Sequence, residues 1–108
     1  MSTSIHDFHD DPRNAHIKIW LNGQLKPRAE AMVSVFDSGF VLGDGVWEGF
    51  RVVAGQPVFL DAHLDRLFEG AKAIALDIGL SRAELKKAIS DTLKANGMRD
   101  DVHVRLMV

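Results

Sequence analysis

Hydrophobic and polar residues alternate along the first part of the chain, and this pattern predicts short β-strands. Residues 17–21 alternate in this way and precede Asn22-Gly23, a strong signal for a hairpin turn. Residues 24–27 are therefore predicted to return as the partner strand. Apolar runs predict further strands at residues 32–36, 46–53 and 58–60.

The hydrophobic period changes to that of a helix after residue 60. Apolar residues recur at helical spacing from Leu64 to Ile78. Asp61 is the predicted N-cap of this helix, and Gly79 is its predicted C-terminal stop.

The last part of the chain predicts a second helix and a final strand. Residues 81–84 form a Ser-Arg-Ala-Glu capping box, and the helix that it opens is predicted to end near Asn96. Residues 102–108 are predicted to form a strand. Early strands followed by two helices and a strand predict an α+β fold, an antiparallel β-sheet with two helices packed on one face.

The composition is ordinary for a soluble globular domain and excludes several classes of function. Hydrophobic residues make up 46% of the 108 residues, charged residues 26%, and the net charge is -2. This charge provides no basic surface for nucleic acid or for membranes. Because the chain has no cysteine, no disulfide framework or cysteine-based zinc site can form. We find no signal peptide and expect a cytoplasmic protein.

Two parts of the chain are predicted, with a boundary after residue 14. Residues 1–14 are interpreted as a flexible acidic arm, and residues 15–108 as one domain. A metal-binding arm is the alternative, but no second group of ligands supports it. Its candidate ligands are His6, Asp7, His9, Asp10 and Asp11. Because the chain stops within an apolar, strand-like run, we also expect it to be a fragment.

Residues 36–51 contain four glycines, and this density predicts a loop that approaches another group closely before a strand begins. On that strand Trp47, Gly49 and Arg51 are predicted to share one face, and Glu48 to lie on the other. The first face offers an aromatic wall, a gap and a cation, which would suit a small planar carboxylate. A surface arginine beside a half-buried tryptophan explains the same pattern. We expect Glu48 to be structural and, if buried, to need a partner.

Three residues outside this strand are candidates for binding an anion. Arg66 lies on the first helix beside the small residues Gly70 and Ala73, which would let a phosphate or another backbone approach. A solvated helical arginine is the alternative interpretation. His103 and Arg105 are predicted to share one face of the last strand, which is a weak anion-site signal.

Taken as a series, these motifs resemble the N-terminal domain of the class IV (fold type IV) pyridoxal-phosphate-dependent aminotransferases. That group includes branched-chain and D-amino-acid aminotransferases, R-selective amine transaminases and aminodeoxychorismate lyase. The similarity extends from about Ile17 to the end of the chain. The matching segments are Trp20-Leu21-Asn22-Gly23, Asp37-Ser38-Gly39, Gly43-Asp44-Gly45-Val46-Trp47-Glu48, Arg51, Phe59-Leu60, His63-Leu64-Asp65-Arg66-Leu67 and Val104-Arg105.

The resemblance implies a role for each candidate residue. Arg66 would bind the phosphate of pyridoxal 5'-phosphate. Trp47, where most members carry Phe or Tyr, would wall the substrate pocket, and Gly49 would leave room for the substrate. Arg51 would meet the substrate carboxylate, and Arg105 falls where branched-chain members also carry arginine. The resemblance itself assigns nothing to His103, which we place on the expected substrate side because it shares a strand face with Arg105. Leu42 stands where branched-chain enzymes often have tyrosine, a departure from their pattern.

The resemblance also implies that part of the active site lies outside this chain. The family carries its Schiff-base lysine and the acid that pairs with the pyridine nitrogen in a second, larger domain. None of the six lysines here matches the family's catalytic position, so the 108 residues alone are expected to be inactive.

The expected function is that of the N-terminal part of an aminotransferase, which moves an amino group from an amino acid or amine to a 2-oxo acid. The enzyme is expected to be a homodimer. The alternatives are an aminodeoxychorismate lyase-type enzyme with the same cofactor, or a non-catalytic module that dimerises through its glycine-rich face.

Overall fold

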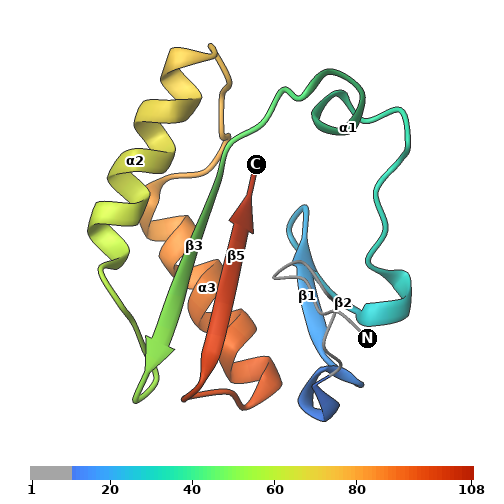
Figure 1. The fold of residues 1–108 in the computed structure, drawn as a ribbon, viewed down its shortest axis with the longest axis vertical. Coiled ribbons are helices and arrows are strands. Elements are labelled where there is room, and N and C mark those ends of the chain that lie inside the picture. The colour runs from blue at the N-terminus through green and yellow to red at the C-terminus, as the bar shows by residue number, and fades with distance from the viewer. Residues whose placement is uncertain (1–10) are drawn as a thin grey trace, which may run out of the picture.

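The computed structural model describes residues 11–108, which form two antiparallel sheets and two long helices (Figure 1). One sheet is the hairpin β1–β2, and the other has three strands in the order β4-β3-β5. Helices α2 and α3 lie on one side of the larger sheet, which confirms the predicted α+β class. The bounds are β1 (Lys18–Leu21), β2 (Gln24–Pro27), β3 (Trp47–Val53), β4 (Gln56–Pro57), α2 (Leu60–Ala73), α3 (Arg82–Asn96) and β5 (Val102–Met107).

The β1–β2 hairpin forms where the sequence predicts it. Asn22 and Gly23 have φ angles of 49° and 92°, which is the left-handed conformation that a tight hairpin turn requires. Leu21 pairs with Gln24 on either side of the turn. The hairpin is a separate sheet, because its strands pair only with each other among the described residues.

The core lies between the larger sheet and the two helices. Burial alternates along β3, so that Phe50 and Val52 face inward and are 3% and 1% exposed. They pack with Ile89 and Leu93 of α3. A second cluster joins the two helices to each other through Leu64, Leu67 and Leu85.

The predicted strand at residues 32–36 is wrong. These residues form no strand, and Met32 and Phe36 are 75% and 86% exposed. An apolar run becomes a strand only when a neighbouring edge accepts its hydrogen bonds, and none does so here within the described part of the chain. The short helices η2 (Arg28–Glu30) and α1 (Ser38–Leu42) flank this segment.

The glycine-rich stretch is also more regular than predicted. Most of residues 36–51 belongs to α1 and to the first part of β3. The Asp37 side chain accepts a hydrogen bond from the Gly39 amide at the start of α1, and Gly43 ends that helix at φ 72°. The irregular parts are residues 36–37 and the connection from Gly43 to Val46.

Helix α2 differs from prediction at both ends. No strand forms at residues 58–60, because Leu60 begins the helix and Phe59 is the N-cap, with φ 54°. Asp61 therefore lies inside the first turn, where its carboxylate pairs with Lys86 Nζ at 2.6 Å. The helix ends at Ala73 rather than near Ile78, since Ala75 turns to φ 55°.

Helix α3 and the last strand agree with the sequence. Ser81 and Glu84 form both hydrogen bonds of the capping box, and Gly97 ends the helix at φ 59°. β5 pairs with β3 along its whole length, from Trp47↔Met107 to Val52↔Val102.

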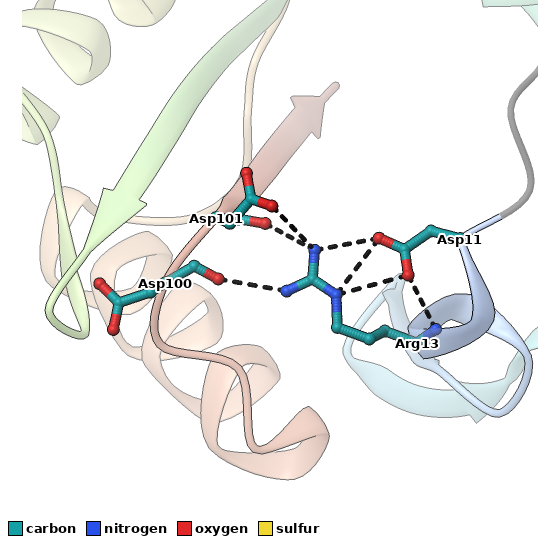
Figure 2. Close-up of polar contacts among 4 residues, drawn as sticks. All are labelled: Asp11, Arg13, Asp100 and Asp101. Carbon is teal, nitrogen blue, oxygen red and sulfur yellow. Dashed lines mark hydrogen bonds and ion pairs between the residues drawn. The ribbon is translucent and has the colours of Figure 1, made fainter.

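Arg13, in the short helix η1 (Pro12–Asn14), ties the start of the described chain to the start of β5 (Figure 2). Its Nη2 donates to the Asp101 carbonyl oxygen at 2.7 Å, and its Nη1 donates to the Asp100 carbonyl oxygen at 3.2 Å. Its Nη2 also pairs with the Asp11 carboxylate at 3.0 Å. The boundary after residue 14 stays a prediction.

The predicted metal-binding arm cannot be judged from the structure. Four of its five candidate ligands lie outside the described residues: His6, Asp7, His9 and Asp10. Among residues 11–108, no three potential ligands come close enough to hold a metal ion. No helix in this part of the chain is long and apolar enough to cross a membrane.

Candidate functional site

The outer face of the larger sheet, opposite the helices, brings together the residues predicted for the substrate side. Trp47, Gly49 and Arg51 alternate with the buried residues of β3. Arg105 is directly opposite Gly49, and His103 is opposite Arg51. Residues opposite one another in an antiparallel pair lie on the same face. All five side-chain positions therefore share this outer face.

Trp47 and Arg105 contact each other on the outer face. The Arg105 guanidinium carbon lies 5.0 Å from the centroid of the Trp47 ring, a cation–π arrangement. Trp47 is nevertheless 58% exposed, so most of its surface is available for another contact. The pair forms a flat aromatic surface with a fixed positive charge beside it.

The His103 ring lies directly against Gly49. A Cβ atom at this position would come within 2.9 Å of His103 Nε2. The predicted gap above Gly49 is thus partly occupied by the His103 ring. In this arrangement the histidine, Arg51 and Arg105 surround one glycine, and the outer-face positions of β3 and β5 carry no carboxylate. The surface suits an anion next to a planar group.

Arg66 is not on this face. It projects from α2 toward the inner side of β3, where its Nε donates to Glu48 Oε2 at 2.9 Å and to Oε1 at 3.2 Å. β4 pairs only with Val52 and Val53, so along the rest of β3 the edge opposite β5 has no strand, and α2 lies beside it (Figure 1). Arg66 therefore lies at the rim of the sheet.

Glu48 is the buried carboxylate with which Arg66 pairs. It is 3% exposed, and the sequence-based expectation that a buried Glu48 would be paired is confirmed. Burial raises the pKa of Glu48, but hydrogen bonds from Arg66 and His63 outweigh burial and hold the pKa below its usual value. The carboxylate in turn raises the pKa of Arg66. Both groups are charged at neutral pH.

His63 is the site residue that sequence reasoning missed. We assign it no role from the sequence, yet its Nδ1 lies 2.7 Å from Glu48 Oε1 and its side chain is only 24% exposed. Its ring packs against that of Phe50, with 5.5 Å between centroids. The available signal was its spacing: His63 and Arg66 are three residues apart and face the same way on a helix.

The small residue beside Arg66 serves the fold. A Cβ on Gly70 would lie 3.3 Å from Val46 Cγ1, so Gly70 lets the chain entering β3 pass close to α2. The group that lies against Gly70 is thus the Val46 side chain. The predicted approach of a phosphate or of another backbone stays a prediction. Ala73, the other small residue, is exposed.

The geometry of Arg66 fits a phosphate group. Its side chain is 74% exposed, and within residues 11–108 its hydrogen bonds go only to Glu48, through Nε. Both terminal nitrogens are therefore available, and the planar guanidinium can donate two parallel hydrogen bonds to phosphate oxygens.

Comparisons with known proteins show which family this chain resembles. Residues 45–108 match the family model described as amino-transferase class IV. The branched-chain-amino-acid aminotransferase-like protein 1 of Arabidopsis thaliana is 50% identical over 95 residues, which are 88% of this chain and 17% of that protein.

Two solved structures share the fold. The branched-chain aminotransferase of Thermoproteus uzoniensis with norvaline has a TM-score of 0.77 at 36% identity and covers 85% of this chain and 32% of that one. The branched-chain amino acid aminotransferase of T. th. complexed with N-(5'-phosphopyridoxyl)-L-glutamate has a TM-score of 0.76 at 31% identity, with the same coverage.

This chain spans 17% of the plant relative and 32% of each solved structure. Its family match nevertheless includes the predicted outer-face residues, Glu48 and Arg66, and continues through the last strand. The chain belongs to the class IV aminotransferases, a pyridoxal-phosphate-dependent family.

Proposed function

We propose that this chain is the N-terminal part of a pyridoxal-phosphate-dependent aminotransferase that moves an amino group from an amino acid or amine to a 2-oxo acid. The observation that carries the proposal is the outer face of β3 and β5. It combines an exposed tryptophan with two arginines and a histidine around one glycine. A substrate carboxylate next to a planar cofactor matches both the charge and the shape of this surface.

In this proposal Arg66 binds the cofactor phosphate through its two terminal nitrogens. Arg51 and Arg105 meet carboxylates of the substrate, and Trp47 and His103 bound the pocket on either side of Gly49. When bound, pyridoxal phosphate supplies the electron sink for the reacting carbon. The residues of this chain bind and orient the cofactor and the substrate, and they exclude water from the site.

The proposal assigns the covalent and proton-transfer chemistry to residues outside these 108. Lys86 and Lys87 pair with Asp61 and Asp91, on or beside α3 and away from the outer face. We therefore assign no catalytic residue to this chain. A homodimer and a cytoplasmic location stay predictions from the sequence and the resemblance.

The choice between donors tests the role of Arg51. In the complete protein, Arg51→Ala should lower kcat/KM for carboxylate-bearing donors much more than for carboxylate-free amines. The expected loss is about tenfold or more, because a charge-assisted hydrogen bond is removed. Lys26→Ala, on the separate hairpin, is the matched control. An unchanged ratio between the two donor classes would remove Arg51 from the substrate site.

A lyase acting on aminodeoxychorismate is the alternative within the same family. The two reactions differ in their co-substrate, since an aminotransferase needs a 2-oxo acid acceptor and the lyase does not. Product formation measured with and without the acceptor separates them. We expect strict dependence on the acceptor, and turnover without it would favour the lyase.

A further inference from the structure

Glu48 is the only charged residue that is buried in the part of the chain from residue 11 to residue 108. Such a group is retained at a cost, because a buried carboxylate must be matched by donors in good geometry. Its donors are Arg66 and His63, two residues on the same face of α2. Arg66 is the proposed phosphate-binding residue, so Glu48 contacts that arginine on the side away from its terminal nitrogens.

Glu48 holds Arg66 by a single nitrogen. The Nε–H group is shared between the two carboxylate oxygens at 2.9 and 3.2 Å. The terminal nitrogens of Arg66 form no hydrogen bond with any residue that the structure describes, and the side chain is 74% exposed. The inner end of the guanidinium is therefore fixed, while its outer end is accessible.

The carboxylate itself is fixed from the core. His63 Nδ1 lies 2.7 Å from Glu48 Oε1, and the His63 ring packs on Phe50 with 5.5 Å between centroids. Phe50 is 3% exposed. A continuous set of contacts thus leads from the buried sheet to an exposed arginine.

We propose that Glu48 is a positioning residue for the phosphate-binding arginine. Acting through Arg66, it holds the guanidinium so that its terminal nitrogens meet the phosphate of the cofactor. This inference rests on the proposed function. An arginine that is already anchored loses less conformational freedom when it binds a ligand.

The negative charge of Glu48 and its anchoring of Arg66 have opposite effects on the affinity for phosphate. A carboxylate close to a phosphate repels it, so an electrostatic effect alone would make Glu48 weaken binding. Anchoring makes it strengthen binding. The sign of the change in affinity therefore distinguishes the two effects.

Two substitutions separate the effect of the Glu48 charge from that of the length of its side chain. Glu48→Asp keeps the charge but shortens the side chain, and Glu48→Gln keeps the length but removes the charge. The dissociation constant of pyridoxal phosphate would be measured by titrating the cofactor-free form of the complete protein. Inorganic phosphate would then compete as a second probe. We expect both variants to bind roughly 2- to 10-fold more weakly, the effect of losing one pre-ordered side chain.

Asp65→Asn is the matched control. Asp65 is the neighbour of Arg66 on α2, but its exposed carboxylate pairs with Arg82 at 2.6 Å. The substitution removes a nearby negative charge without touching Arg66, so affinity should change by less than about twofold. In an Arg66→Ala background, Glu48→Asp should have no further effect, because the proposed action passes through that arginine.

The outcomes separate this inference from the proposed function. Unchanged or tighter binding in either Glu48 variant would overturn the positioning role. Unchanged affinity in Arg66→Ala would overturn the phosphate assignment itself. Circular dichroism must confirm that each variant is folded. If Glu48→Gln does not fold, Glu48→Asp alone decides the question.

Discussion

Neighbouring residues on β3 have opposite surroundings, and this separates the residues that hold the fold from those that face the proposed substrate. Glu48 and Phe50 point inward and are each 3% exposed, whereas Trp47 points outward and is 58% exposed. The period of two in a strand makes this separation automatic. A shift of one residue in the β3–β5 register would exchange the two sets.

The first residue-scale prediction concerns the pH dependence of stability. Because the folded-state pKa of Glu48 is lowered, its contribution is complete above about pH 4.5, the ordinary glutamate value. It is lost as the pH falls through the lower folded-state pKa. Urea unfolding between pH 7 and pH 3 should therefore show a smaller acid loss in Glu48→Gln than in the wild type.

At neutral pH the same Glu48→Gln variant should be less stable by about 1–2 kcal/mol. This loss lies near the lower end of the range of about 1.5–3 kcal/mol for hydrogen bonds to a charged group, because Arg66 is largely exposed. If the free energy of unfolding fell equally with pH in both proteins, the pKa of Glu48 would not be lowered by folding. The other acids whose pKa is lowered, such as Asp61 and Glu84, are present in both proteins and cancel in the comparison.

The second residue-scale prediction concerns Gly49. In Gly49→Ala the new methyl group would displace the His103 ring, whose Nε2 atom lies 2.9 Å from the Cβ position. The ring is the far end of an exposed side chain, so the free energy of unfolding should change by less than about 1 kcal/mol. NMR should show a large shift of the His103 ring signals. Unmoved signals would contradict the contact.

At the scale of elements, one side chain joins the hairpin to α3. Asn96 accepts a hydrogen bond from the Lys18 amide at 2.8 Å and donates one to the Lys18 carbonyl oxygen at 3.0 Å. A side-chain amide thus pairs with β1 as a neighbouring strand would. Its Nδ2 also donates to the Thr92 carbonyl oxygen at 2.8 Å, which fixes its orientation.

Asn96→Ala should therefore loosen the hairpin more than the rest of the domain. Hydrogen–deuterium exchange of residues 18–27 should accelerate, while the amides of β3 should keep their protection. Lys94→Ala, an exposed change on the same helix, is the control. Equal acceleration in the hairpin and in β3 would show that the two sheets open together.

Elements with complete local signals were predictable from the sequence. The Asn22-Gly23 turn and the capping box at residues 81–84 contain the groups that satisfy their own backbones, and both form as predicted. The segment at residues 32–36 has strand-like composition but no partner, and composition alone cannot supply one. Phe59 was missed as an N-cap because it takes a left-handed conformation that is rare for a large residue.

The candidate site was predictable only in part, because local sequence patterns do not specify which elements pack together. Alternation along a strand placed Trp47, Gly49 and Arg51 on one face. The contact of Glu48 with Arg66 and His63 depends on how α2 packs against β3, which no local pattern encodes.

At the scale of the whole molecule, apolar surface gathers on the parts that the core leaves uncovered. Most of the segment between η2 and β3 is exposed, and several of its apolar side chains face solvent. The exposed apolar residues of this segment are Met32, Val33, Val35, Phe36, Phe40, Val41 and Leu42. An apolar surface of this kind is typical of a region that contacts other protein. This agrees with the proposal that the active site is completed by residues outside this chain.

The central claim is that Arg66 binds the cofactor phosphate through its terminal nitrogens while Glu48 holds the Nε of Arg66. A crystal structure of the complete protein with pyridoxal phosphate tests this most directly. We predict that the Arg66 terminal nitrogens lie about 2.7–2.9 Å from phosphate oxygens while Nε stays on Glu48. A phosphate bound away from Arg66, or an Arg66 that has left Glu48 to reach it, would contradict the account.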